Sequence, residues 1–148
     1  MFKNKSVVEL FLAGSRWLLA AVFVAAGFPK LLAPQDFALT IADYGLLPDG
    51  LVLPAAVILP LIELIVAVGL LFKRRWAFYL SVGLLIMFIA VLSYGIHLGL
   101  GIDCGCFGPN DPQHASVAGL KTALYRDLML LVPAGFLVWS SSMRKKIA

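Results

Sequence analysis

Four long runs of apolar residues, separated by short polar segments, dominate the sequence. Each run holds about the 20 residues that a helix needs to cross a bilayer. None alternates between apolar and polar positions, as the strands of a membrane barrel do. The pattern predicts an all-α membrane protein whose single domain, 1–148, is a four-transmembrane-helix antiparallel bundle. The predicted helices cover about 8–28, 51–72, 76–98 and 119–143.

Composition supports a membrane protein and excludes several other classes. Hydrophobic residues make up 61% of the chain and charged residues 14%, with a mean hydropathy of +0.96. Soluble domains are about 45–50% apolar and about 25% charged. A soluble enzyme, a disordered segment and a disulfide-dense secreted domain are therefore poor interpretations. We expect the first run to remain as a helix rather than to be cleaved as a signal peptide, because Arg16 interrupts it.

The basic residues gather at three places that predict one orientation. Lys3 and Lys5 precede the first run, residues 73–75 (KRR) link the second to the third, and residues 144–146 (RKK) follow the fourth. Excess lysine and arginine mark cytoplasmic loops. We therefore expect both termini in the cytoplasm of a bacterial inner membrane, and the loops 29–50 and 99–118 in the periplasm. The net charge of +4 then reflects topology, and we expect no nucleic-acid partner.

Two ionisable residues inside the apolar runs predict a buried ion pair. Arg16 and Glu63 are each costly in a bilayer, roughly 3 kcal/mol on insertion scales. Counted from the predicted cytoplasmic ends, Arg16 lies about 12 Å deep and Glu63 about 13–14 Å deep. We predict an Arg16–Glu63 pair in the bundle interior. Such a pair would serve either to set the helix register or as a proton or quinone contact, and the sequence leaves both open.

A second polar group is expected near the periplasmic face. Tyr94 and His97 are three residues apart and share one face of the third helix. Arg126 lies near the outer end of the fourth helix, where its side chain can snorkel toward water. Adjacent Arg126 and Asp127 are expected to diverge and to need separate partners. Tyr94 and Arg126 are candidate quinone contacts, and His97 is either an acid–base group or an ordinary interfacial residue.

The sharpest local signal is the Cys104-Gly105-Cys106 segment. A disulfide needs Cα atoms about 4.4–6.8 Å apart, so a bridge between such close residues requires a tight turn, which Gly105 permits. A bridge in so small a ring is strained, and strained disulfides are the exchangeable ones. The expected periplasmic location favours disulfide formation. We take Cys104 and Cys106 as a redox pair, with His97 and Asp103 as candidate acid–base groups.

Two other interpretations of the cysteines stay open. One is a static clip that closes the loop. The other is a metal site formed by both cysteines with His97 and His114. Metal sites usually separate paired cysteines by two or more residues, so this spacing is a weaker match and we expect no metal.

Several segments resemble those of a known family. The chain resembles the DoxX-like superfamily and, within it, the MauE family of methylamine utilisation proteins. The resemblance covers nearly the whole length, and its most specific part is the segment with both cysteines. The matching segments are 27–31 (GFPKL), Pro34, 44–48 (YGLLP), 60–63 (PLIE) with Gly69, and 104–108 (CGCFG).

The resemblance implies a small four-helix membrane protein that works in thiol redox chemistry. MauE proteins accompany a thioredoxin-like partner and are implicated in maturing the disulfide-rich small subunit of methylamine dehydrogenase. DoxX relatives are linked to quinone-coupled oxidation of sulfur compounds or thiols. The resemblance assigns a redox role to Cys104 and Cys106, and a role in the core to Lys30 and Glu63.

The function expected is membrane thiol–disulfide exchange. The cysteine pair would react with a periplasmic thioredoxin-like protein, and a quinone is the membrane carrier that we consider for the electrons. The alternative is a non-enzymatic assembly factor, in which the cysteines are a structural clip. A transporter fits less well, because no inverted repeat is visible. The composition requires a lipid bilayer around the protein. Association into a homo-oligomer stays open.

Overall fold

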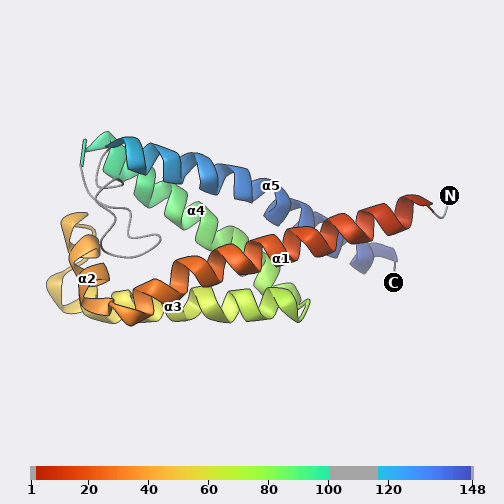
Figure 1. The fold of residues 1–148 in the computed structure, drawn as a ribbon, viewed down its shortest axis with the longest axis horizontal. Coiled ribbons are helices and arrows are strands. Elements are labelled where there is room, and N and C mark those ends of the chain that lie inside the picture. Colours follow the sequence, from red (N-terminus) through yellow and green to blue (C-terminus); the bar gives the residue numbers. More distant parts are fainter. Residues whose placement is uncertain (1–2, 101–116, 148) are drawn as a thin grey trace.

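The protein is a bundle of four long helices with one short helix at one end (Figure 1). The computed structural model describes residues 3–100 and 117–147. The helices are α1 (Lys3–Leu32), α2 (Pro34–Asp43), α3 (Asp49–Leu71), α4 (Arg75–His97) and α5 (Val117–Ile147). All but α2 are long and apolar enough to cross a membrane, which confirms the four predicted spans. Helix α2 lies within the segment 29–50, which the hydropathy pattern showed only as a link.

The four long helices close around a shared core. Helix α1 packs against α3 and α5, and α4 packs against the same two helices, while α2 packs mainly on α3. The core consists of apolar side chains from all four long helices, among them Leu19, Val66, Leu85 and Ala134. Large apolar side chains also cover the outside: Leu10, Met129 and Val132 are each more than 70% exposed. An outer surface of this kind suits hydrocarbon rather than water.

Proline and glycine separate α1, α2 and α3. Pro34 disfavours the helical conformation of the residue before it, and Ala33 accordingly leaves the helix with φ −131° and ψ 65°. Helix α2 begins at that proline, where the missing N–H is no loss. After α2, Gly45 takes φ +63°, a left-handed conformation that glycine adopts without strain. Pro48 then starts α3 in an extended conformation.

The turn between α3 and α4 is a compact helix stop. Lys73 has φ 57°, and its N–H donates to the carbonyl of Leu70 at 3.2 Å. The N–H of Arg74 donates to the carbonyl of Gly69 at 2.9 Å, which completes the pair of bonds that characterises a Schellman motif. Helix α4 ends with the same two bonds, from Gly99 to Ile96 and from Leu100 to Gly95.

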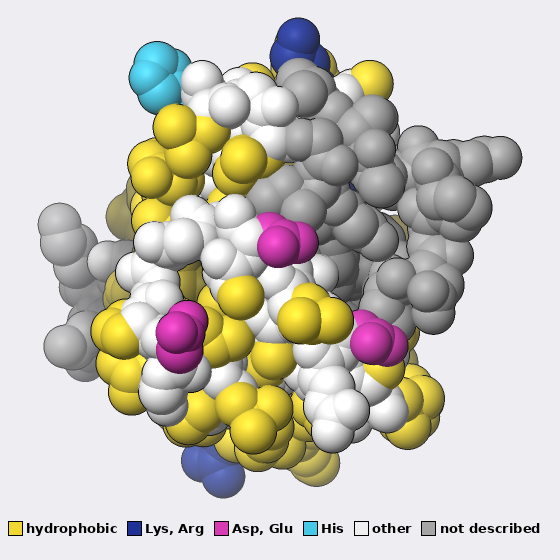
Figure 2. Space-filling view, turned by 90° about the vertical axis from the view of Figure 1, so that its left-hand side faces the viewer, with side chains coloured by type: hydrophobic (Ala, Val, Ile, Leu, Met, Phe, Trp, Pro, Cys, Tyr) yellow, Lys and Arg dark blue, Asp and Glu magenta, His cyan; other side chains and the backbone are white. Residues whose placement is uncertain are grey.

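The two ends of the bundle differ in charge. The α3–α4 turn, with its three basic residues, lies at the same end as the two chain termini (Figure 1). The opposite end carries α2, the start of α3 and the end of α4. Its exposed acidic residues are Asp36, Asp43 and Asp49, and Figure 2 looks onto this end. We call these ends the basic end and the acidic end.

The contact of Tyr44, the residue after α2, with α4 depends on Gly95. A Cβ atom at this position would lie 2.7 Å from Cε1 of Tyr44, whose ring is buried at the end of α2. We expect Gly95→Ala to lower the unfolding free energy by about 1–3 kcal/mol, because an overpacked site must shift its neighbours. Thermal unfolding in detergent would measure this loss. Gly83→Ala on the same helix is the control, since nothing lies within 4 Å of its Cβ position; an equal loss there would contradict the explanation.

Candidate functional site

The most unusual site in the described structure is a buried group of charged side chains inside the bundle. Lys30, Glu63 and Asp127 are each less than 5% exposed, and all three belong to helices that could span a membrane. Ionisable residues in such helices are rare and costly, which makes each of them a candidate for a functional role. We call these three residues the buried charge cluster.

Lys30 is the centre of this cluster. Its Nζ donates to Oε1 of Glu63 at 2.8 Å. It also lies 4.9 Å from the ring centroid of Phe37 and 5.0 Å from that of Phe88, within cation–π range. The carboxylate comes from α3, and the two rings come from α2 and α4. One ammonium group of α1 therefore contacts three other helices.

Asp127 completes the cluster from α5. Its carboxylate interacts electrostatically with both Lys30 and Glu63. Its Oδ1 also accepts a hydrogen bond from Nε of Arg126 at 3.2 Å. The two adjacent side chains thus bond each other, so the prediction that they diverge was wrong. The side chain of Arg126 is 30% exposed, so the guanidinium bends back toward the buried carboxylate from the edge of the bundle.

The close approach of α1 to α3 positions Glu63. A Cβ atom at Gly27 would lie 3.1 Å from Oε2 of Glu63 and 3.1 Å from the carbonyl oxygen of Pro60. A glycine at this point therefore allows the two helices to approach, as small residues do in membrane bundles. Among the described residues, Oε2 of Glu63 has no hydrogen-bond partner although it is buried. The site thus contains a buried acceptor that no described residue satisfies.

The predicted Arg16–Glu63 pair was wrong, because Glu63 pairs with Lys30. The prediction counted depth from assumed helix ends, whereas α1 continues to Leu32 and brings Gly27 level with Glu63. Arg16 is eleven residues before Gly27, or about 16 Å along the helix axis. Its Nε atom is buried with no hydrogen-bond partner in the described part of the chain.

Two other predicted site residues that the structure describes, Tyr94 and His97, are not brought into the buried charge cluster. Cys104, Cys106 and Asp103 lie outside the described residues, as does His114. His97 is exposed as the last residue of α4, and Tyr94, on the same helix, is 41% exposed. Arg126 joins the cluster through its hydrogen bond to Asp127. The bonds described for Lys30 link it to Glu63 and the two phenylalanine rings, with no bond to Tyr94 or His97.

Sequence reasoning missed that Lys30 partners Glu63. Lys30 lies in one of the two links predicted to face the periplasm, beside the end of an apolar run. This position is typical of a residue at the boundary between membrane and water. The family resemblance did indicate a role in the core for Lys30. The structure adds that Lys30 lies in the last turn of α1, where a cation is favoured.

Comparison with known proteins identifies the family. The family profile described as "Methylamine utilisation protein MauE" matches residues 8–140. The chain belongs to the MauE family. It is 37% identical over 124 residues to a protein named methylamine utilization protein MauE from Paracoccus denitrificans, a match that covers 81% of this chain and 67% of the relative. A protein of the same name from Methylophilus methylotrophus is 35% identical over 106 residues, which cover 70% of this chain.

The matches leave part of the MauE relatives uncovered. The match spans 54% of the Methylophilus methylotrophus protein's own length. No solved structure matches this chain. The family assignment and the four long apolar helices together establish a MauE-family membrane protein with several membrane-spanning helices.

Proposed function

We propose that this MauE-family protein is a membrane thiol–disulfide redox protein. Its Cys104–Cys106 pair would exchange disulfides with a periplasmic thioredoxin-like protein and so support the maturation of periplasmic proteins. The names of its relatives place them in methylamine utilisation. Maturation of a methylamine dehydrogenase is the process that the family resemblance implies. The proposed location is the bacterial inner membrane, with the segments 29–50 and 99–118 on the periplasmic side.

The observation that carries this proposal is where the cysteine-containing segment joins the bundle. Helix α4 ends at His97 and α5 begins at Val117, and both of these helix ends lie at the acidic end (Figure 1). The basic α3–α4 turn lies at the other end, and basic loops mark the cytoplasm. The segment between α4 and α5 would then face an oxidising compartment, where disulfides form and persist.

The exchange step needs no reactant beyond the two proteins. A thiolate of the reduced pair attacks a sulfur of the partner's disulfide, and the partner's second sulfur leaves as a thiolate that takes up a proton. The second cysteine then attacks the mixed disulfide, which releases the partner as a dithiol and leaves Cys104–Cys106 oxidised. Two electrons and two protons have moved from the pair to the partner, and the reverse order of steps oxidises the partner.

A quinone is the carrier that we propose for the membrane side of this cycle. Two thiols and one quinone give one disulfide and one quinol, so electrons and protons balance. Tyr94 and Arg126 are the proposed contacts, with His97 and Asp103 as acid–base groups near the sulfurs. The support is that Tyr94, His97 and Arg126 all lie in the half of α4 or α5 that adjoins the acidic end.

Single-cysteine variants provide the test. We expect Cys106→Ser or Cys104→Ser to accumulate a mixed disulfide with a periplasmic thioredoxin-like protein, because the resolving thiol is gone. Non-reducing gels and mass spectrometry of the adduct would detect it. The control is the variant that replaces both cysteines by serine, which has no thiol left, since the chain contains two cysteines.

Two outcomes would contradict the proposal. If neither single variant forms an adduct and the double variant keeps its biological activity, the cysteines are a clip and the protein is a non-enzymatic assembly factor. If a membrane-impermeant maleimide applied to spheroplasts after mild reduction labels neither cysteine, the pair does not face the periplasm.

A further inference from the structure

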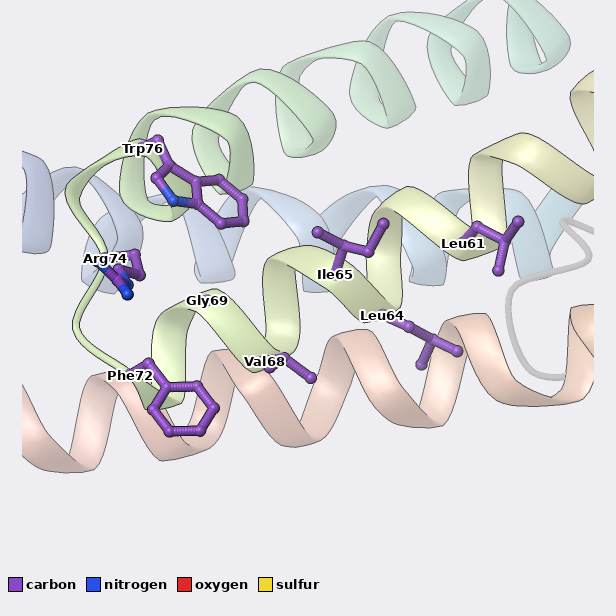
Figure 3. Close-up of a pocket in the computed structure, with 8 residues that line it drawn as sticks. All are labelled: Leu61, Leu64, Ile65, Val68, Gly69, Phe72, Arg74 and Trp76. Carbon is purple, nitrogen blue, oxygen red and sulfur yellow. The ribbon is translucent and has the colours of Figure 1, made fainter.

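An apolar groove lies on the outside of the bundle, near the basic end. It has no role in the proposed thiol–disulfide exchange. It has a volume of about 500 Å³ and runs along α3 beside the start of α4. Figure 3 shows Arg74, Phe72 and Trp76 at one end and Leu61 at the other, with Leu64, Ile65 and Val68 between them. Every side chain that lines it is apolar except that of Arg74.

Local packing creates the groove. Gly69 has no side chain, and a Cβ atom there would lie 2.9 Å from Cη2 of Trp76 and 2.7 Å from Cβ of Ala77. The Trp76 indole therefore lies against the α3 backbone and forms a wall. The tight turn through Lys73, with φ 57°, places Arg74 directly after α3 and before that indole.

The length of the groove suits an extended hydrocarbon chain. Leu61 lies on α3 and Phe72 directly follows that helix, eleven residues later, or about 16 Å along the helix axis. Its aliphatic side chains remain open to the surroundings: Leu61, Ile65 and Val68 are each more than 40% exposed. The groove thus offers a long apolar surface in the part of the molecule that would contact lipid tails.

The basic residues at one end of the groove favour a lipid with a negatively charged headgroup. Lys73, Arg74 and Arg75 are all exposed, and none has a carboxylate partner within salt-bridge distance in the described part of the chain. Arginine binds phosphate oxygens through charge-assisted and often bidentate hydrogen bonds. A tryptophan beside it suits the boundary between hydrocarbon and water. Three uncompensated cations favour a lipid with net negative charge over a zwitterionic one, whose own cation would be repelled.

We propose that this groove binds one anionic phospholipid, with the phosphate on Arg74 and one acyl chain along α3 from Phe72 toward Leu61. The site would hold a specific lipid at the basic end of the bundle. It is independent of the cysteine chemistry, which the proposed function assigns to the acidic end.

Fluorescence of Trp76 can report occupancy directly. The chain has three tryptophans, and Trp17 and Trp139 are each at least 60% exposed, so Trp17→Phe with Trp139→Phe leaves Trp76 as the single reporter. The purified full chain in detergent is titrated with brominated phosphatidylglycerol or brominated phosphatidylcholine. We expect half-maximal quenching at about a tenfold lower concentration of the anionic lipid.

Two variants separate a site from diffuse attraction. Arg74→Gln should raise the midpoint for phosphatidylglycerol most of the way to that for phosphatidylcholine, because Arg74 is the basic residue that lines the groove. Arg75→Gln removes an equal charge from a residue that does not line the groove, and should change the midpoint by at most about fivefold, the effect of one basic residue near an anionic surface. Equal quenching by both lipids would overturn the proposal, and so would equal effects of the two variants.

A groove-filling variant tests the acyl-chain part of the proposal. Val68→Phe should weaken quenching by both lipids, because the larger side chain occupies the middle of the groove. Unchanged quenching in this variant would show that the lipid chain does not lie along α3. Circular dichroism of each variant checks that the helices are retained.

Discussion

Replacing Lys30 by methionine should destabilise the protein by about 3–5 kcal/mol, the cost of removing one partner from a buried ion pair. The loss would be large because Glu63 is fully buried and its second oxygen already lacks a partner in the described structure. The same substitution removes the cation from between the rings of Phe37 and Phe88. Unfolding of the purified protein in mixed micelles, followed by circular dichroism, measures the change.

Two further variants show whether the lost stability comes from the unpaired charge of Glu63. The double variant Lys30→Met with Glu63→Met should recover most of the lost stability, since a buried ion pair replaced by apolar residues of similar volume is often no less stable. Lys121→Met is the control for removing a lysine, because Lys121 is exposed. A loss below about 1 kcal/mol for Lys30→Met would mean that the pair is not desolvated.

The double variant also separates the two roles considered for the buried pair. If it is stable and supports normal redox turnover, the Lys30–Glu63 pair sets the register of α1 against α3 and nothing more. If it is stable but turnover is lost, the pair takes part in proton or quinone chemistry.

Gly27→Leu should have a comparably large effect, at or above the upper end of the 1–3 kcal/mol typical of overpacking. The Cβ position already lies 3.1 Å from a backbone oxygen of α3 and 3.1 Å from the Glu63 carboxylate, so a larger side chain must push the two helices apart. Separating these helices would also stretch the 2.8 Å bond between Lys30 and Glu63. Thermal unfolding in detergent measures the loss.

The matched control for Gly27→Leu is Gly14→Leu on the same helix. Nothing lies within 4 Å of the Gly14 Cβ position, and the residue is exposed, so an added side chain would extend into the surrounding lipid or detergent. We expect its unfolding free energy to stay within about 0.5 kcal/mol of the parent. Equal losses in the two variants would show that the effect comes from glycine itself rather than from the α1–α3 contact.

The amino-acid sequence alone determined the number of membrane-spanning helices and the separation of charge between the two ends. Both depend on one-dimensional properties: a run of about 20 apolar residues must be a spanning helix, and the basic residues lie in short clusters beside such runs. The motif-based resemblance likewise needed no coordinates, and the family profile confirmed it over residues 8–140.

Only the tertiary structure decided which buried charges meet. Depths counted from the predicted helix ends placed Arg16 and Glu63 at the same level in the membrane. In the structure, α1 contacts α3 at Gly27, several turns further along α1, and Lys30 therefore lies opposite Glu63. The hydropathy pattern did not predict α2, because its ten residues are too few to span a membrane. Its Phe37 nevertheless contributes a cation–π contact to Lys30. A run of apolar residues specifies that a helix crosses the membrane, whereas its longitudinal offset depends on where small residues let two backbones touch.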